Sequence, residues 1–302
     1  RNLIEMKKLI AFFFIAFLAI GLFACEEREY PVDGEFLAYE VSVSRNAPQV
    51  VFVTVTIEKG KVVAYNIDTR QGTRTIGGTE LEPTYTFSFN AQTKKELGDA
   101  YGMKAASPIG KEWYEQAAAI EAFWLENGVD AVTVNEDGDI DNVTGASITD
   151  SYSSVAKKAL ENAKAGKFVA ILADGTNLYS AELVLNAKGE IVSLMLDTLQ
   201  KKRGTAADVF EWNAQTKQEL GYAYHMHYAT SGATNDTEYQ AWLTANNKLE
   251  WFEQANLITD DIIANGWSTT AAENVPAGVT VSTEEYYEVL SLVFGFAGDS
   301  VK

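Results

Sequence analysis

The stretch FNAQTKKELGDAYGMK (89–104) returns later in the chain as WNAQTKQELGYAYHMH (212–227). Self-similarity of this kind is the signature of a repeated structural unit, so the chain is predicted to be a tandem duplication. Two further pairs of stretches, in compatible order, support this reading: YEQAAAIEAFWLENG (114–128) with FEQANLITDDIIANG (252–266), and EKGKVVAYNIDTRQG (58–72) with AKGEIVSLMLDTLQK (187–201).

Each copy opens with alternating β-branched and apolar residues that are interrupted by a Lys-Gly pair. The runs are VVFVTVTIEKGKVVAYNI (50–67) and AELVLNAKGEIVSLML (181–196), and this pattern is typical of a half-buried antiparallel hairpin. A helical section follows in each copy. The sequence therefore predicts an α+β fold with two tandem domains, 30–166 and 167–302, each an antiparallel sheet with packed helices.

Length and charge limit the classes of function. A chain of 302 residues with 47% hydrophobic content is long enough for two ordinary domains. Its net charge of −18 comes from 42 Asp and Glu residues against 24 Lys and Arg residues. Because phosphate backbones are bound mainly by Lys and Arg, nucleic acid is not an expected partner.

The amino-terminal segment is predicted to be a targeting signal rather than part of the fold. From Met6 the chain reads MKKLIAFFFIAFLAIGLFACEE, which resembles a bacterial lipoprotein signal with its lipobox over residues 1–25. This resemblance implies a lipid on Cys25 that anchors the mature protein to the membrane. A transmembrane helix is the alternative. Cys25 is the only cysteine, which excludes disulfides within the chain and cysteine-ligated redox centres.

The first copy ends with DNVTGASITDSYSSV (141–155), a run of small hydroxyl residues before an amphipathic segment. Upstream, two short strands are expected to join at Asp137-Gly138. Apolar residues from Tyr152 to Leu160 recur at helical spacing, so Ser147 and Thr149 are expected at or just before a helix amino terminus. Hydroxyls in that position commonly cap the free backbone N–H groups, which is the structural interpretation of this stretch.

A chemical interpretation rests on the wider spacing. Asp141-x-x-Thr144-Gly145-Ala146-Ser147 is similar to the flavinylation motif of the FMN-binding domain family. That resemblance implies that a flavin transferase joins the phosphate of FMN to the Ser147 hydroxyl as a phosphodiester. Asp141 would then belong to the motif that the transferase recognises, or else be a solvated turn carboxylate. The new anion would lie at the helix amino terminus, close to Thr149.

The resemblance extends beyond the motif, to tandem FMN-binding lipoproteins of Gram-positive bacteria. By position it places five residues near the isoalloxazine ring: Tyr101, Gly102, Met103, Lys104 and Trp113. Core packing is the alternative role for each of them. In the second copy Thr280 corresponds to Ser147 and is a candidate second FMN site. The motif around it is degenerate, with Asn274, Ala277 and Val279 at the Asp, Thr and Ala positions.

Two metal interpretations are weaker. The stretch NEDGDIDN (135–142) resembles a calcium loop, but Thr133 and Thr144 fall where that loop requires carboxylates. The only histidines, His225 and His227, are too few to define a metal site without carboxylate partners.

We therefore expect a lipid-anchored electron carrier on the extracytoplasmic face of the cell membrane. It would take electrons from a quinol- or NADH-linked membrane donor and pass them on through covalent FMN, whose attachment makes retention independent of affinity. Two other functions stay open. One is a cofactor-free lipoprotein that binds cell-wall glycans through exposed aromatic residues, and the other is a flavin-dependent extracellular reductase.

Overall fold

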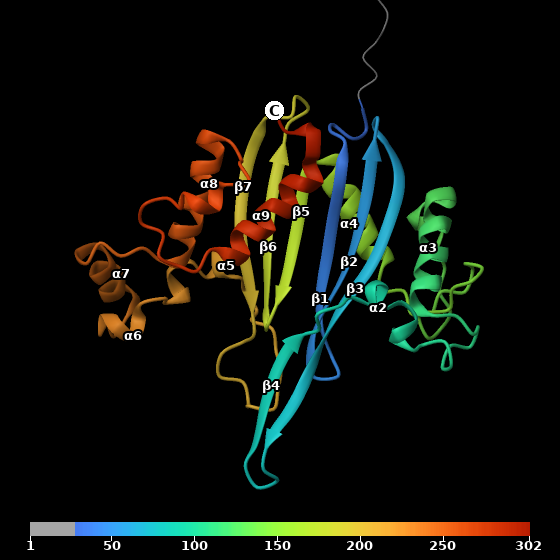
Figure 1. Ribbon diagram of the computed structural model, residues 1–302, viewed down its shortest axis with the longest axis horizontal. Coiled ribbons are helices and arrows are strands. Elements are labelled where there is room, and N and C mark those ends of the chain that lie inside the picture. The colour runs from blue at the N-terminus through green and yellow to red at the C-terminus, as the bar shows by residue number, and fades with distance from the viewer. Residues whose placement is uncertain (1–27) are drawn as a thin grey trace, which may run out of the picture.

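Each copy of the repeat folds into an antiparallel sheet followed by helices, so the protein is α+β, as the sequence predicts (Figure 1). The computed structural model describes residues 28–302. The predicted signal peptide and lipobox, with Cys25, lie outside these residues. Within residues 28–302, no helix is both long and apolar enough to cross a membrane.

The first sheet has the strand order β1-β2-β3-β4 and the second has the order β5-β6-β7. The strands are β1 (Gly34–Ser44), β2 (Ala47–Glu58), β3 (Lys61–Gly78), β4 (Pro83–Phe89), β5 (Lys167–Asp174), β6 (Asn177–Leu185) and β7 (Ile191–Gln200). The α-helices are α2 (Lys94–Leu97), α3 (Trp113–Asn127), α4 (Ser153–Lys164), α5 (Lys217–Leu220), α6 (Tyr228–Ser231), α7 (Asp236–Ala245), α8 (Trp251–Asn265) and α9 (Glu284–Ala297). Short 3-10 helices are η1 (Gly98–Tyr101), η2 (Val129–Ala131), η3 (Gly221–Tyr224), η4 (Ala271–Glu273) and η5 (Gly298–Ser300).

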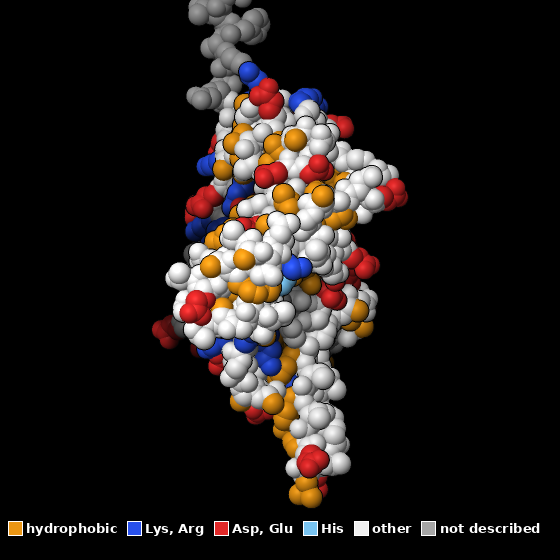
Figure 2. Space-filling model, turned by 90° about the vertical axis from the view of Figure 1, so that its left-hand side faces the viewer, with side chains coloured by type: hydrophobic (Ala, Val, Ile, Leu, Met, Phe, Trp, Pro, Cys, Tyr) orange, Lys and Arg blue, Asp and Glu red, His pale blue; other side chains and the backbone are white. Residues whose placement is uncertain are grey.

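The predicted Lys-Gly pairs are turns in both sheets. Lys59 and Gly60, between β2 and β3, have φ angles of 53° and 73°, and Gly189, between β6 and β7, has a φ of 83°. These left-handed conformations allow adjacent antiparallel strands to connect tightly. The hairpin of β3 and β4 is longer and projects beyond the rest of the protein, with hydrophobic side chains along it (Figures 1 and 2).

Corresponding helices in the two copies are capped by the same hydrogen bonds. Thr93 caps α2 and Thr216 caps α5, each in a reciprocal pair with the glutamate three residues later. Glu112 and Glu250 cap α3 and α8 in the same way. Such capping boxes satisfy backbone N–H groups that have no partner inside the helix. The two copies therefore share local structure as well as sequence.

One segment belongs to the second copy alone. Helices α6 and α7 lie between η3 and α8, whereas the first copy passes from η1 to α3 without a helix. The sequence SGAT (231–234), which resembles the core of the flavinylation motif, falls in this inserted segment. It begins at the last residue of α6 and continues through Gly232, which has a φ of 65°.

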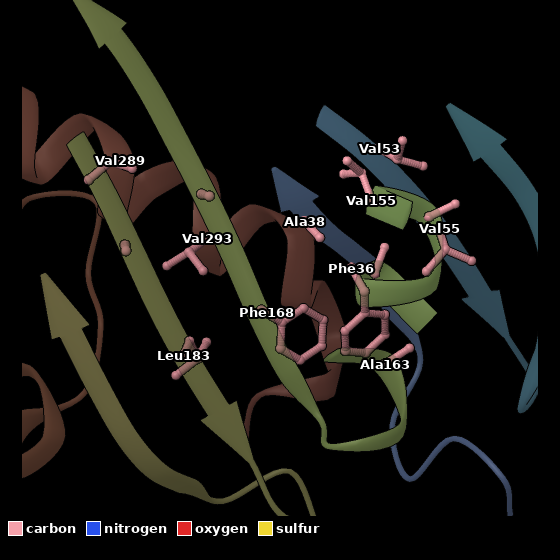
Figure 3. Close-up of a cluster of buried hydrophobic side chains, with 14 of the residues drawn as sticks. Phe36, Ala38, Val53, Val55, Val155, Ala163, Phe168, Leu183, Val289 and Val293 are labelled. Atoms are coloured by element: carbon pink, nitrogen blue, oxygen red, sulfur yellow. The ribbon is translucent and has the colours of Figure 1, made fainter. Parts of the chain in front are cut away.

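The hydrophobic core is continuous across the two copies. Phe36 of β1 and Phe168 of β5 are fully buried, and their rings stack with centroids 4.3 Å apart (Figure 3). Buried side chains from both copies form one contiguous cluster around this pair. The stack lies at the seam where β1 and β5 run side by side (Figure 1).

The helices α4 and α9 cover opposite faces of this arrangement. Figure 1 shows α9 in front of β5 and β6, with α4 behind β1 and β2. Ala38 of β1 borders a pocket with residues of α4, and its neighbour Leu37 borders another pocket with residues of α9. Since successive side chains of a strand point to opposite faces, the two helices lie on different sides.

Candidate functional site

A cavity of about 340 Å³ lies in the first copy, between the β2-β3 part of the sheet, α3 and the segment that precedes α4. Its volume falls within the range of roughly 300–1,000 Å³ that is usual for small-molecule sites. Five residues singled out from the sequence contribute to its lining: Tyr101, Met103, Trp113, Ser147 and Thr149. The other lining residues are Gln49, Val51, Thr69, Lys94, Asp139, Ile148, Ser151 and Tyr152.

Ser147 is held against α3 by a buried amide. The Ser147 backbone N–H donates to Gln116 Oε1 at 2.9 Å, and the Ser147 hydroxyl lies 3.4 Å from the same oxygen. The Gln116 side chain is fully buried, and its Nε2 donates to Ser107 Oγ and to the Lys111 carbonyl. Because both ends of the amide are bonded, the position of the Ser147 backbone at the cavity wall is fixed.

The loop before Ser147 has the predicted turn at Asp137-Gly138. Gly138 has a φ of 82°, and isolated bridges pair Val134 with Ile140 and Asp139 with Thr149. The Thr149 hydroxyl donates to Asp139 Oδ1 at 2.6 Å. These contacts hold the two sides of the loop together and bring Thr149 to the cavity.

The predicted helix start is wrong. Helix α4 begins at Ser153, and the side chain of Asp150 accepts the backbone N–H groups of Tyr152 and Ser153 at 3.1 and 2.9 Å. Ser147 and Thr149 lie before this turn and do not cap the helix. Apolar spacing located the buried face of the helix but not its first residue. A phosphate on Ser147 would therefore not lie at the amino terminus of α4.

The remaining residues of the motif do not line the cavity. Asp141 and Thr144 are exposed, and Asp141 Oδ1 accepts the Thr133 hydroxyl at 2.5 Å. Gly145 has a φ of 94°, a conformation that favours glycine, and Ala146 is buried.

Two of the five residues that the resemblance places near the isoalloxazine ring do not line the cavity. Gly102 ends η1 with a φ of 75°, and Lys104 is exposed. The backbone N–H groups of Met103 and Lys104 both donate to the buried carboxylate of Glu112 at 2.9 Å. This contact orients the segment so that Tyr101 and Met103, on either side of Gly102, contribute to the cavity.

Lys94 is a cavity residue that the sequence analysis did not single out. Its Nζ lies 5.1 Å from the ring centre of Tyr101 and 5.2 Å from that of Trp113, which are cation–π distances. Burial lowers the pKa of Lys94 to about 8, against the opposing influence of Asp68. The repeat itself could have pointed to Lys94, because the shared sequence NAQTK ends in Lys94 in the first copy and in Lys217 in the second.

The far wall of the cavity is made by Trp113 and Tyr152. Trp113 Nε1 donates to the Tyr152 hydroxyl at 3.0 Å, and burial raises the pKa of that tyrosine to about 12. Thr69 also lines the cavity, and its buried hydroxyl has no partner within hydrogen-bond distance among residues 28–302, although it lies close enough to the Tyr152 hydroxyl to lower the pKa of that tyrosine. A buried polar atom without a partner is unfavourable, so a ligand that bonds to Thr69 would relieve it.

The second copy has a corresponding cavity of about 290 Å³ with an equivalent lysine. Thr280 is placed as Ser147 is, with its backbone N–H donating to Gln254 Oε1 at 2.6 Å. Thr280 itself, however, is not among the lining residues. These are Tyr179, Lys217, Tyr224, Met226, Trp251, Val281, Ser282, Glu285 and Tyr286.

The two histidines have ordinary partners. His225 Nε2 pairs with Asp236 Oδ1 at 2.9 Å, and His227 Nε2 lies 3.2 Å from the Leu249 carbonyl oxygen. In the described part of the chain, no group of three or more His, Cys, Asp or Glu side chains is arranged to hold a metal ion.

Comparisons with known proteins leave the family open. No family model matches the chain. A stretch of 36 residues, 12% of this chain, is 58% identical to a chlorophenol reductase from Desulfitobacterium hafniense and spans only 11% of that protein. A solution NMR structure of a protein from Clostridium thermocellum aligns with 43% of this chain and 91% of its own, at 21% identity. Its TM-score of 0.28 is too low to support a conclusion about fold or function.

The partly buried Lys94 makes the stability of the fold depend on pH. Lys94 has a folded pKa of about 8, below its unfolded value of about 10.4, so between these pH values the unfolded chain binds more protons. The free energy of unfolding attributable to Lys94 therefore rises with pH across this window. We expect Lys94→Met to be more stable than the wild type by roughly 2–3 kcal/mol at pH 7, with the gap nearly closed at pH 10.

Urea denaturation of the flavin-free chain at pH 7, 8.5 and 10 measures this difference. Lys104→Met is the matched control, because Lys104 is exposed and its replacement should produce no gap that changes with pH. A difference between Lys94→Met and the wild type that stays constant over the three pH values would contradict the prediction.

Proposed function

We propose that the protein is an electron carrier that holds FMN covalently at Ser147, with the isoalloxazine ring in the first cavity. The observation that supports this most strongly is the convergence on one cavity of the motif serine with Tyr101, Met103 and Trp113. These residues are far apart in the sequence and were grouped by the family resemblance alone.

The residues present fit such a group. Tyr101 and Trp113 provide aromatic surface for a planar ring, while the Lys94 ammonium and the Thr69 hydroxyl are donors for its carbonyl oxygens. Ser147 supplies the hydroxyl that a phosphodiester requires. When bound, FMN would supply one- and two-electron transfer, which this chain's side chains do not provide.

The chain's own residues would position and tune that group. Gln116 fixes the Ser147 backbone, so the attachment point stays at the cavity wall. Trp113 and Tyr152, joined by a hydrogen bond, exclude water from one side. The Lys94 ammonium favours added negative charge in the cavity, which would raise the reduction potential of a ring that becomes anionic on reduction.

The location and partners that we propose follow from the same resemblance. A lipid on Cys25 would hold the protein on the extracytoplasmic face of the cell membrane, where a flavin transferase attaches FMN. A quinol- or NADH-linked membrane protein would supply the electrons. Tethering would keep the cofactor from being lost by dilution outside the cell.

A flavin-dependent reductase is the second candidate. It is favoured by the short match to a protein named chlorophenol reductase, although that match covers too little of either chain to indicate a substrate. The glycan-binding alternative receives less support, since three tryptophans are buried and the other three are partly buried, so none offers a fully exposed ring.

The experiment that tests the proposal is expression of the mature chain with a flavin transferase, followed by denaturation and intact-mass measurement. We expect yellow colour that stays with the denatured polypeptide and a mass increase matching FMN. A colourless chain of unmodified mass would contradict the proposal. A reductase would in addition show saturable, acceptor-specific turnover that an equal concentration of free flavin does not produce.

A further inference from the structure

The second cavity is lined by aromatic side chains that could hold a ligand without a covalent bond to the protein. Tyr179 and Tyr286 contact edge to face with ring centres 5.3 Å apart, and Trp251 lies 5.6 Å from Tyr286. Tyr224 adds a further ring, 6.5 Å from Trp251. Four aromatic side chains around about 290 Å³ form a space suited to a planar ring rather than to a whole nucleotide.

One cation is buried in this wall. Lys217 Nζ lies 5.1 Å from the Tyr224 ring centre and 5.0 Å from that of Trp251, and it is 3.3 Å from the Tyr286 hydroxyl. Within residues 28–302 it forms no salt bridge with a carboxylate. The charged groups that act on it are Arg203, Asp197 and Glu285, of which only Glu285 lines the cavity.

The same arrangement occurs in the first cavity. Lys94 stands over Tyr101 and Trp113 at 5.1 and 5.2 Å, nearly the distances of its counterpart in the second copy. An ammonium that is buried, as in Lys217, or partly buried, as in Lys94, beside two aromatic rings is expensive to desolvate, and a packing role would be filled as well by methionine. Its presence in both cavities indicates a shared demand for a hydrogen-bond donor to a ligand oxygen.

Covalent attachment is disfavoured in the second cavity. Thr280 does not line it, and Asn274, Ala277 and Val279 depart from the motif. Ser282 is the one hydroxyl-bearing loop residue on the lining, and it is exposed. A ligand of this cavity would therefore exchange with solvent.

We propose that the second cavity reversibly binds a planar ring that carries carbonyl oxygens, of the isoalloxazine or quinone class, with Lys217 donating to a carbonyl. Aromatic walls bind either ring through stacking, and the ammonium and hydroxyl donors match the carbonyl oxygens that both classes share. The site stands on its own residues and does not require FMN at Ser147.

The test uses the mature chain expressed without a flavin transferase, carrying Lys94→Met to weaken the first cavity. Riboflavin and menadione are titrated separately, and quenching of tryptophan fluorescence is followed, with calorimetry for stoichiometry. We expect one site per chain for at least one probe, and the probe that binds identifies the ring class. Adding Lys217→Met should weaken that binding about tenfold or more.

A second variant guards against a folding defect in the Lys217→Met chain. Ser282→Trp fills the mouth of the cavity from an exposed position and should block binding, whereas Thr149→Trp at the mouth of the first cavity should leave it unchanged. Absence of binding by both probes would overturn the proposal. So would affinity that neither Lys217→Met nor Ser282→Trp alters, and neither result would affect the proposal for Ser147.

Discussion

We expect Ser147→Ala to carry no covalent flavin when it is expressed beside a flavin transferase, while the wild type is fully labelled. The phosphodiester requires a side-chain oxygen, and alanine has none. The backbone contact to Gln116 involves the Ser147 N–H, which alanine keeps, so the loop should retain its position. Intact-mass spectrometry of the denatured chains measures the loss directly, and the variant should be colourless after denaturation.

Two neighbouring hydroxyl variants serve as controls for this result. Thr149→Ala loses a hydrogen bond to Asp139 but should keep the label, because Ser147 remains. Thr280→Ala should likewise keep a label at Ser147, and a mass difference between it and the wild type would count a second attached FMN. If Ser147→Ala retained the full label, the attachment site would have to be elsewhere in the chain.

Phe168→Ala should lower the free energy of unfolding by about 3–5 kcal/mol, the range for removing a large aromatic side chain from a packed core. Phe168 is fully buried, stacks on Phe36 at 4.3 Å and closely approaches Gly34, where even an added Cβ would meet its ring at 2.6 Å. The cavity left behind would lie at the seam between the two copies. Urea denaturation followed by tryptophan fluorescence and by far-UV circular dichroism measures the change.

The same experiment reports whether the two copies unfold together. Because buried residues of both copies form one cluster, we expect a single transition that moves as a whole in Phe168→Ala. Leu81→Ala is the control, since Leu81 is 94% exposed on the β3-β4 hairpin and its removal should change stability by less than about 0.5 kcal/mol. Two separate transitions, only one of them shifted, would show that the copies unfold independently.

Much of the fold followed from the repeat. Alternating runs and Lys-Gly pairs predicted the hairpins, and the turns at Lys59-Gly60 and Gly189 confirm them. The first residue of α4 was not predictable in the same way. Ser147, Thr149 and Asp150 are all capable of capping, and the choice among them depends on how Gln116 and Asp139 hold the preceding loop.

The candidate site was predictable only in part. The motif and its position led to Ser147, and family resemblance led to Tyr101, Met103 and Trp113. Lys94 was missed because a lysine near a short helix is usually solvated, and only tertiary packing shows that it lies between two aromatic rings. The two copies also share residues that cap helices, such as Thr93 with Thr216 and Glu112 with Glu250, so the repeat alone does not single out Lys94.

The placement of α4 and α9 on opposite faces has a consequence for how electron-transfer partners would reach the two cavities. The first cavity includes Tyr152, just before α4, and the second includes Tyr286 of α9, so each cavity adjoins the helix that covers a different face. Under the two proposals, a donor bound beside one cavity and an acceptor bound beside the other would occupy different parts of the surface. A membrane-anchored protein would then not have to rotate between accepting electrons from the donor and passing them to the acceptor.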